Sequence, residues 1–173
     1  MAGIDRGMTE REEVLDGRAR RFSKTLVERA TGKGRTVATA ESCTAGMVAA
    51  YIASVPGASA VLRGGAVTYC DEVKHEVLGV SEETLAEHTA VSSQTAVEMA
   101  ERAREMFSAD CAVSLTGYAG PDGGTEDDPA GTVYIGASNE AGAICRRFEF
   151  AGSRNEVRAE AAIAALEMLE ALL

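Results

Sequence analysis

One stretch of the sequence decides the expected fold: Thr39-Ala40-Glu41-Ser42-Cys43-Thr44-Ala45-Gly46. It follows a β-like run, residues 35–38, and leads into an apolar segment, residues 47–52, that is predicted to be helical. A hydroxyl, a thiol and a second hydroxyl therefore stand in series at a strand-to-helix junction. Backbone N–H groups are unpaired at a helix start, so a nucleophile or an anion is easily stabilised there. A simple helix cap is the other interpretation of Ser42, and this stretch alone leaves it open.

Helix and strand patterns alternate outward from this stretch. Helices are expected at residues 9–32, 42–54, 71–78, 81–87 and 92–107 and from 153 onward, and strands at 35–40, 61–69, 111–115, 132–137 and 143–150. Capping boxes at Thr9 to Glu12 and at Ser153 to Glu156 mark the first and last of these helices. The alternation predicts an α/β fold, a three-layer α/β/α sandwich with a mixed, mostly parallel sheet.

The length and composition predict a single domain. The chain has 173 residues, of which 46% are hydrophobic and 25% charged, as in an ordinary soluble protein. We expect residues 1–8 to be a disordered tail and residues 9–173 to form the domain. No apolar run approaches the roughly 20 residues that cross a bilayer, and the N-terminus is polar, so we expect no membrane partner and a cytoplasmic location.

The charge balance restricts the partners. The formal net charge is −10, with 17 Lys and Arg against 27 Asp and Glu. The chain contains no basic block, so we expect no nucleic-acid partner. An anionic substrate would have to be bound by local groups, because the overall field repels it.

Four cysteines, Cys43, Cys70, Cys111 and Cys145, are spaced without a C-x-x-C pair or a histidine at metal-ligand spacing. We expect free thiols and no bound metal.

A serine nucleophile needs a base. His75 and His88 lie in polar, helix-like surroundings, and we interpret both as solvent-facing rather than as the base of a triad. Lys74 lies just past an apolar strand, where burial would lower its pKa, although a surface role remains open. Tyr69, five residues earlier, could relay a proton or orient the hydroxyl.

A glycine-rich loop, Thr116 to Thr125, lets backbone N–H groups approach a ligand closely. It matches neither the P-loop nor the G-x-G-x-x-G pattern, so a phosphate cradle and a tight turn both remain open. Arg154, at the start of the last helix, is either a phosphate partner or a surface charge. Because ligands of such sheets bind at the carboxyl ends of strands, we expect Ser42, Tyr69 and Thr116 to converge.

Together these segments resemble the CinA C-terminal domain family, whose enzymatic members are nicotinamide-nucleotide (NMN) amidohydrolases of the PncC type. The likeness extends over residues 14–173. The motifs that carry it are Ala40 to Gly46, Gly64-Gly65 leading to Tyr69 and Lys74, Leu78-Gly79-Val80, His88 to Ser92, Thr116 to Gly124, Pro129 to Tyr134, and Gly152 to Arg158.

The resemblance implies hydrolysis of the NMN carboxamide to nicotinate mononucleotide and ammonia, in pyridine nucleotide recycling. It places Ser42 as nucleophile, with Lys74 and Tyr69 as activating partners, and the following helix start as oxyanion site. The substrate-binding residues that it implies are Cys43, Thr44, Thr116, Gly117, Gly120, Gly124 and Arg154. It also implies no cofactor and a homo-oligomer, most simply a symmetric dimer.

The sequence departs from the family pattern at three places. Ala45 replaces a more usual glycine, which would be a mild change on a helix. Cys70-Asp71 stands where Ser-Asn is common, and the charge of Asp71 would raise the pKa of Lys74. Tyr118 replaces an aliphatic residue and could reshape the pocket. These departures keep open two alternatives: a non-catalytic nucleotide-binding module, and a serine amidohydrolase for another small amide.

Overall fold

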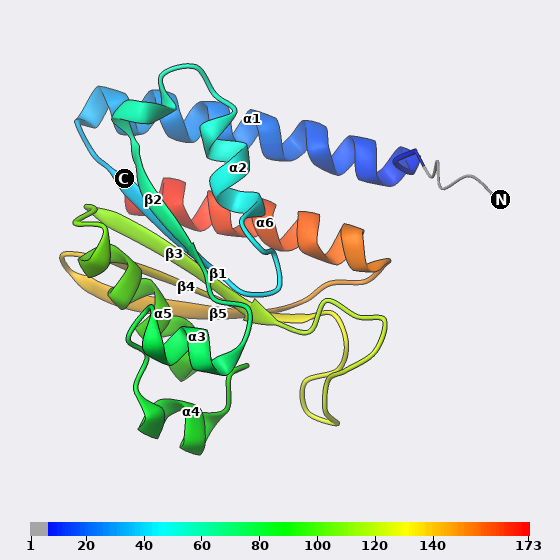
Figure 1. Ribbon diagram of the computed structural model, residues 1–173. Coiled ribbons are helices and arrows are strands. Elements are labelled where there is room, and N and C mark those ends of the chain that lie inside the picture. Colours follow the sequence, from blue (N-terminus) through cyan, green and yellow to red (C-terminus); the bar gives the residue numbers. More distant parts are fainter. Residues whose placement is uncertain (1–6) are drawn as a thin grey trace, which may run out of the picture.

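The computed structural model of the chain describes residues 7–173, so most of the predicted tail at residues 1–8 lies outside it. A five-stranded sheet forms the centre, with the strands in the order β2-β1-β3-β4-β5 (Figure 1). The strands are β1 (Val37–Glu41), β2 (Leu62–Val67), β3 (Cys111–Gly117), β4 (Thr132–Asn139) and β5 (Gly142–Glu149).

Helices cover both faces of the sheet, as the sequence predicts. They are α1 (Glu10–Lys33), α2 (Met47–Ala53), α3 (Asp71–Glu76), α4 (Glu82–His88), α5 (Ser93–Met106) and α6 (Arg154–Leu172), with one 3₁₀ turn, η1 (Ala58–Ala60). Figure 1 shows α1, α2 and α6 on one side and α3, α4 and α5 on the other. Within the described residues, no helix is both long enough and apolar enough to span a membrane.

The expectation of a mostly parallel sheet is wrong. β1 pairs in parallel with β2 and β3, whereas β3–β4 and β4–β5 are antiparallel. The physical reason lies in the connections: a parallel neighbour needs a long crossover, and the chain makes no helical crossover after β3. A glycine-rich loop and then a tight turn at Asn139–Gly142 reverse it twice.

β1 and β3 are buried on both faces, and most of their residues are accordingly apolar. Val37 and Val113 point into the core beneath α1 and α6, while Ala38 and Ala112 point into the smaller core beneath α5. Alanine on the second face leaves room for α5 to approach the strands closely.

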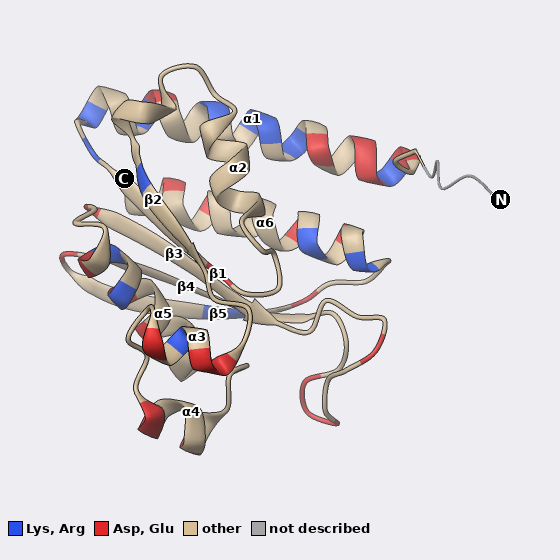
Figure 2. Ribbon diagram, in the orientation of Figure 1, with Lys and Arg blue, Asp and Glu red and all other residues tan. Residues whose placement is uncertain are grey.

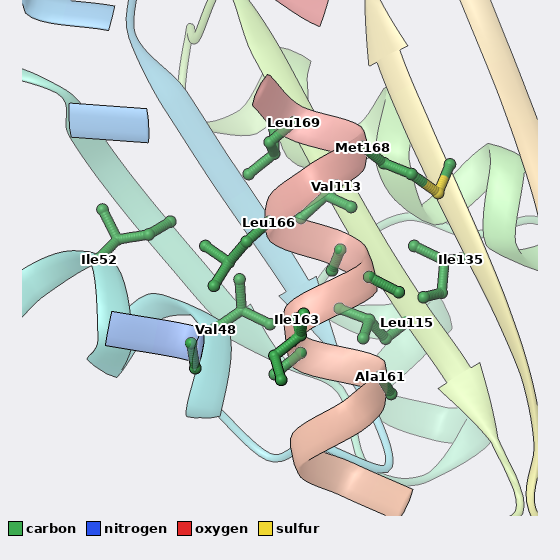
Figure 3. Packing of buried hydrophobic residues seen from close by; sticks show 14 of the residues in the cluster. Val48, Ile52, Val113, Leu115, Ile135, Ala161, Ile163, Leu166, Met168 and Leu169 are labelled. Carbon is green, nitrogen blue, oxygen red and sulfur yellow. The ribbon is translucent and has the colours of Figure 1, made fainter. Parts of the chain in front are cut away.

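α6 supplies much of the larger core. Figure 3 shows Ile163, Leu166 and Leu169 of α6 between the sheet and α2. They pack in one cluster with Val113 and Leu115. Burying each such side chain contributes about 1.5–3 kcal/mol, so α6 is firmly fixed on the sheet.

The predicted capping boxes are confirmed. Thr9 and Glu12 cap α1 reciprocally, and Ser153 and Glu156 do the same for α6. The second box fixes the start of α6. The first turns of this helix lie beside the carboxyl ends of β1 and β2, where the candidate site is found.

Candidate functional site

The carboxyl ends of β1 and β2 bring two distant segments together. The strands pair up to Glu41 and Val67, and the Thr68 N–H then donates to the Glu41 carbonyl oxygen at 2.8 Å. Ser42 follows directly, and its N–H donates to the Leu115 carbonyl oxygen of β3 at 2.9 Å. The serine is therefore fixed between the ends of three strands.

α3 directs Lys74 back to this serine. Lys74 Nζ lies 3.4 Å from Ser42 Oγ and donates to the Thr68 carbonyl oxygen at 3.1 Å. The two residues are 1% and 8% exposed, so the pair is almost closed to solvent. A solvent-facing role for Lys74 is thereby excluded.

Burial lowers the pKa of Lys74 below the ordinary lysine value. Asp71 acts in the opposite direction, with its Oδ1 3.7 Å from Nζ, and the thiols of Cys70 and Cys43 also favour the charged amine. Desolvation outweighs these three groups. Asp71 thus raises the pKa of Lys74, as the sequence predicts, but the net shift of this pKa is still downward.

The thiol of Cys43, next to Ser42, is not activated as a nucleophile. Burial raises the pKa of Cys43 to about 11, so this cysteine is a neutral thiol at neutral pH. At this turn the hydroxyl of Ser42, and not the thiol, is the group that has an amine beside it.

The helix-cap interpretation of Ser42 is wrong. α2 begins only at Met47, and residues 42–46, which we call the nucleophile turn, end at Gly46, an N-cap without a side-chain bond. Glu41 does the capping instead. Its carboxylate accepts from the N–H groups of Gly46, Val48 and Ala49 at 2.9–3.1 Å.

The sequence predicts an oxyanion site at the start of this helix. In the structure Glu41 already occupies the N–H groups there, so the helix start cannot hold an oxyanion. The nucleophile turn offers other donors. Among residues 7–173, the backbone N–H groups of Cys43 and Thr44 have no hydrogen-bond partner, whereas that of Ala45 donates to the Ser42 carbonyl oxygen.

The sequence predicts that Ala45 lies on a helix, where its methyl group would be a mild change. In the structure Ala45 lies before the helix, which begins at Met47. Its φ is +53°, in the left-handed region where a Cβ is unfavourable. Gly46 follows with φ +91°. The nucleophile turn thus requires two consecutive left-handed residues, which explains why a glycine at position 45 would fit it better.

Arg158 of α6 holds this turn from the other side. Its Nε donates to the Cys43 carbonyl oxygen at 3.0 Å, and its Nη2 donates to the Thr44 carbonyl oxygen at 2.9 Å. Arg158 and Glu41 were not singled out from the sequence as functional residues. Both lie inside family-like motifs, but only the fold shows that they contact the turn.

Tyr69 is not brought to the serine. It is 56% exposed, and its hydroxyl accepts from Arg154 Nη2 at 2.7 Å. Arg154 Nη1 also donates to the Gly120 carbonyl oxygen at 2.9 Å. Three of the predicted site residues, Tyr69, Gly120 and Arg154, are therefore joined by hydrogen bonds in a cluster that we call the rim, and none of these bonds reaches Ser42 or Lys74.

The predicted loop begins later than expected, because Thr116 and Gly117 belong to β3. Thr116 is fully buried, and its hydroxyl donates to the Ala90 carbonyl oxygen at 2.6 Å. A Cβ at Gly117 would collide with the Thr132 carbonyl of β4. Both residues therefore have packing roles in this structure.

Gly124 lies deeper in the loop, where it forms an isolated bridge with Pro129. Its φ is +96°, and a Cβ would meet the backbone of residues 128–130, so a tight turn explains this glycine without a ligand. Figure 2 shows acidic residues on this loop and along α3 and α4. These acidic residues repel an anion that approaches from their side of the site.

Neither histidine contacts the serine. His75 Nδ1 is within hydrogen-bond distance of the Val80 carbonyl oxygen, at 2.8 Å, and its Nε2 lies 3.8 Å from Glu82; His88 Nε2 lies 4.0 Å from Glu87. Over the part of the chain that the structure describes, no group of three or more His, Cys, Asp or Glu side chains could hold a metal ion.

Residues 19–173 match the family model described as CinA C-terminal domain. The chain is 45% identical over 157 residues to the nicotinamide-nucleotide amidohydrolase PncC of Escherichia coli K12, a match that covers 90% of this chain and 95% of that protein. Among solved structures, the competence/damage inducible protein CihA from Agrobacterium tumefaciens matches with a TM-score of 0.87 and 38% identity, over 90% of this chain and 96% of that one.

Other relatives are longer. The chain is 46% identical over 134 residues to the putative competence-damage inducible protein of Acetivibrio thermocellus, a match that covers 78% of this chain. It spans only 32% of that protein. The likeness to the longer relative therefore concerns about a third of its length.

Proposed function

The chain belongs to the CinA C-terminal domain family, and from that premise we propose that it is an amidohydrolase that cleaves the carboxamide of NMN through Ser42. The observation that carries the proposal is the Ser42–Lys74 pair, with 3.4 Å between Oγ and Nζ. The 45% identity to a protein named nicotinamide-nucleotide amidohydrolase supports the choice of substrate.

In the first half-reaction, neutral Lys74 accepts the proton of the Ser42 hydroxyl while Oγ attacks the amide carbon. The burial that lowers the pKa of Lys74 supports this role, because only the neutral amine can accept a proton. The oxyanion is then stabilised by the N–H groups of Cys43 and Thr44, whose carbonyl groups Arg158 holds in place.

The tetrahedral intermediate collapses when its C–N bond breaks. Lys74 returns the proton to the departing nitrogen, which leaves as ammonia, and an ester joins the acyl group to Ser42. Water attacks this ester in the second half-reaction, with Lys74 again accepting a proton. Nicotinate mononucleotide is released and the serine hydroxyl is restored.

The nucleotide portion would bind at the rim. Arg154 uses two of its five N–H donors on Gly120 and Tyr69, and the remaining donors suit a phosphate. In this proposal Tyr69 orients Arg154 instead of relaying a proton, because its hydroxyl contacts that guanidinium and not the serine.

Ammonia release from NMN by the purified chain tests the proposal. We expect turnover by the parent and a loss of at least about 1,000-fold in kcat for Ser42→Ala, because the attacking oxygen is removed. Ser59→Ala, at an exposed serine, is the matched control and should keep the parent's rate. Full activity in Ser42→Ala would refute the nucleophile assignment.

The same assay separates the two alternatives. NMN binding by calorimetry without any ammonia release would favour the nucleotide-binding module. Turnover of another small amide, such as free nicotinamide or glutamine, in preference to NMN would favour a different substrate.

A further inference from the structure

One buried hydroxyl next to the Ser42–Lys74 pair has no hydrogen-bond partner. It belongs to Thr68, which is fully buried, and none of the residues that the structure describes bonds to its Oγ1. The backbone of Thr68 is satisfied, because its N–H donates to the Glu41 carbonyl oxygen and its carbonyl oxygen accepts from Lys74 Nζ at 3.1 Å. A buried polar group without a partner is costly, so the place of this hydroxyl needs an explanation.

The register of the sheet places Thr68 beside the serine. β1 and β2 pair in parallel up to Glu41 and Val67, so one further step along both strands sets Ser42 opposite Thr68. The residues two positions earlier on both strands are alanines that pack in the core beneath α5. Because side chains alternate between the faces of a sheet, Ser42 and Thr68 point to that same face. α3, which carries the lysine, also lies on this side of the sheet (Figure 1).

Other buried hydroxyls lack a partner but have different surroundings. They are those of Ser23, Thr39 and Thr44. Ser23 belongs to α1, and Thr39 of β1 faces α2, so both lie on the opposite side of the sheet. Thr44 belongs to the nucleophile turn. Of these four residues, Thr68 is the one whose own carbonyl oxygen holds the amine of the proposed base.

We infer that the Thr68 hydroxyl binds the departing nitrogen of the amide in the first half-reaction and the attacking water in the second. This inference rests on the proposed function. Lys74 must give a proton to the nitrogen and later take one from the water, so both atoms occupy the same place beside Nζ. A hydroxyl oxygen next to that place can accept a hydrogen bond from an N–H of the nitrogen or from an O–H of the water.

The hydroxyl has the same task in both half-reactions. In the first, an N–H of the amide donates to Thr68 Oγ1, which turns the nitrogen lone pair toward protonated Lys74. The proton moves to the nitrogen, the C–N bond breaks with its electron pair on nitrogen, and ammonia leaves. In the second, one O–H of the water donates to Thr68, and the other gives its proton to neutral Lys74 while the oxygen bonds to the acyl carbon. The bond from this carbon to Ser42 Oγ then breaks, and Lys74 returns the proton to Oγ.

Substitutions at position 68 test the hydroxyl alone, because the contact with Lys74 is made by the backbone carbonyl. Thr68→Val keeps the volume of the side chain and removes the hydroxyl. In NMN hydrolysis we expect kcat to fall about 30-fold without a rise in KM, since one hydrogen bond to the transition state is lost. Thr68→Ser keeps the hydroxyl and should retain at least about a third of the parent's kcat.

Thr39→Val is the matched control. It removes another fully buried, unpartnered hydroxyl from the same sheet, but from the face opposite to Lys74. This variant should keep the parent's kcat. If Thr68→Val does not fold by circular dichroism, Thr68→Ala replaces it and is compared with Thr68→Ser, from which it differs only in the hydroxyl group.

Two further readouts separate a role in the reaction from a merely structural one. The rising limb of the pH–rate profile should stay at the parent's pH in Thr68→Val, because the base and its carbonyl contact remain. Hydroxylamine competes with water for the acyl group on Ser42, and as a stronger nucleophile it depends less on an oriented position. The ratio of the hydroxamate to nicotinate mononucleotide should therefore rise about 10-fold in Thr68→Val. A variant with a loosened fold would slow both products alike.

The outcomes distinguish this inference from the proposed function. If the parent hydrolyses NMN, then an unchanged kcat, a shifted limb or an unchanged product ratio in Thr68→Val would each overturn the role of Thr68 and leave the proposed function intact. Equal losses in Thr68→Val and in either Thr68→Ser or Thr39→Val would also overturn it, because the hydroxyl at position 68 would not be the cause. A parent that releases no ammonia from NMN would overturn the proposed function and the role of Thr68 together.

Discussion

Lys74 is a buried amine beside an exposed carboxylate, and the two surroundings act on its proton in opposite directions. Burial favours the neutral amine, while Asp71 favours the charged one. Because a general base works only when it is unprotonated, kcat/KM should rise with pH through the lowered pKa of Lys74. The activity would be lost as the pH falls below that pKa.

Asp71→Asn removes the group that opposes burial. The pKa of Lys74 should fall further, so the rising limb of the pH–rate profile should move to lower pH and activity at neutral pH should increase. The measurement is kcat/KM for NMN across pH. Glu76→Gln, on the same helix, removes a charge of the same sign as a control. A limb that moves to higher pH in Asp71→Asn would contradict Lys74 as the base.

The backbone at Ala45 gives a second prediction. Ala45→Gly relieves a left-handed alanine, worth about 1–2 kcal/mol, but it also adds freedom to the unfolded chain. We expect a net stabilisation of about 0.5–1 kcal/mol, seen as a rise of roughly 2 °C in Tm. Ala50→Gly, at an exposed position in the middle of α2, is the control and should lower Tm, because glycine is unfavourable in a helix.

At the scale of single residues, the sequence predicts the positions of the candidate site residues better than it predicts their hydrogen-bond partners. The positions of Ser42 and Lys74 follow from two strands that end at one edge, and the structure brings the pair together as the motifs suggest. Tyr69 and Thr116 lie at the expected strand ends but have different partners. Side-chain direction at a strand end depends on neighbouring segments, which the local pattern does not contain.

At the scale of elements, Glu41 has an unusual task for a strand residue. Its buried carboxylate replaces the cap of α2 and separates that helix from the nucleophile turn. Sequence periodicity predicts the existence of α2 but places its start five residues too early. A carboxylate that reaches over a whole turn leaves no local signature, so the boundary could not be found from spacing.

Glu41→Gln keeps the shape but replaces an acceptor oxygen with an amide group that faces N–H donors. We expect a loss of about 2 kcal/mol in the free energy of unfolding, with a fall in kcat because the turn loosens. Chemical denaturation measures the first effect and NMN turnover the second. Glu28→Gln, at an exposed residue of α1, should change neither. Unchanged stability in Glu41→Gln would show that the carboxylate is not needed as a cap.

At the scale of the whole molecule, the formal charge of −10 opposes an anionic substrate. Raising the ionic strength from about 0.02 to 0.15 M screens this repulsion, so KM for NMN should fall while kcat stays constant. Steady-state kinetics with added sodium chloride measure the change in KM and in kcat. A KM that rises with salt would instead show that Arg154 and its neighbours dominate the field that the substrate meets.

The layered architecture was predictable because helix and strand patterns alternate, and a chain of this composition must bury both faces of a sheet. The direction of the last two strands was harder to predict. β4 and β5 contain residues typical of strands of either direction; the glycine-rich loop reverses β4 against β3, and the short turn at residues 140–141 reverses β5 against β4.

The hydrogen bonds of Arg158 have a consequence for heat inactivation. They make the nucleophile turn dependent on the first turns of α6, which end in solvent at Ser153. Helix ends open locally at far lower cost than a whole domain. Fraying there would release Cys43 and Thr44 while the sheet stays folded. On heating, catalysis should therefore fade several degrees before the far-ultraviolet signal melts, and Ser153→Ala, which weakens that end, should widen the interval.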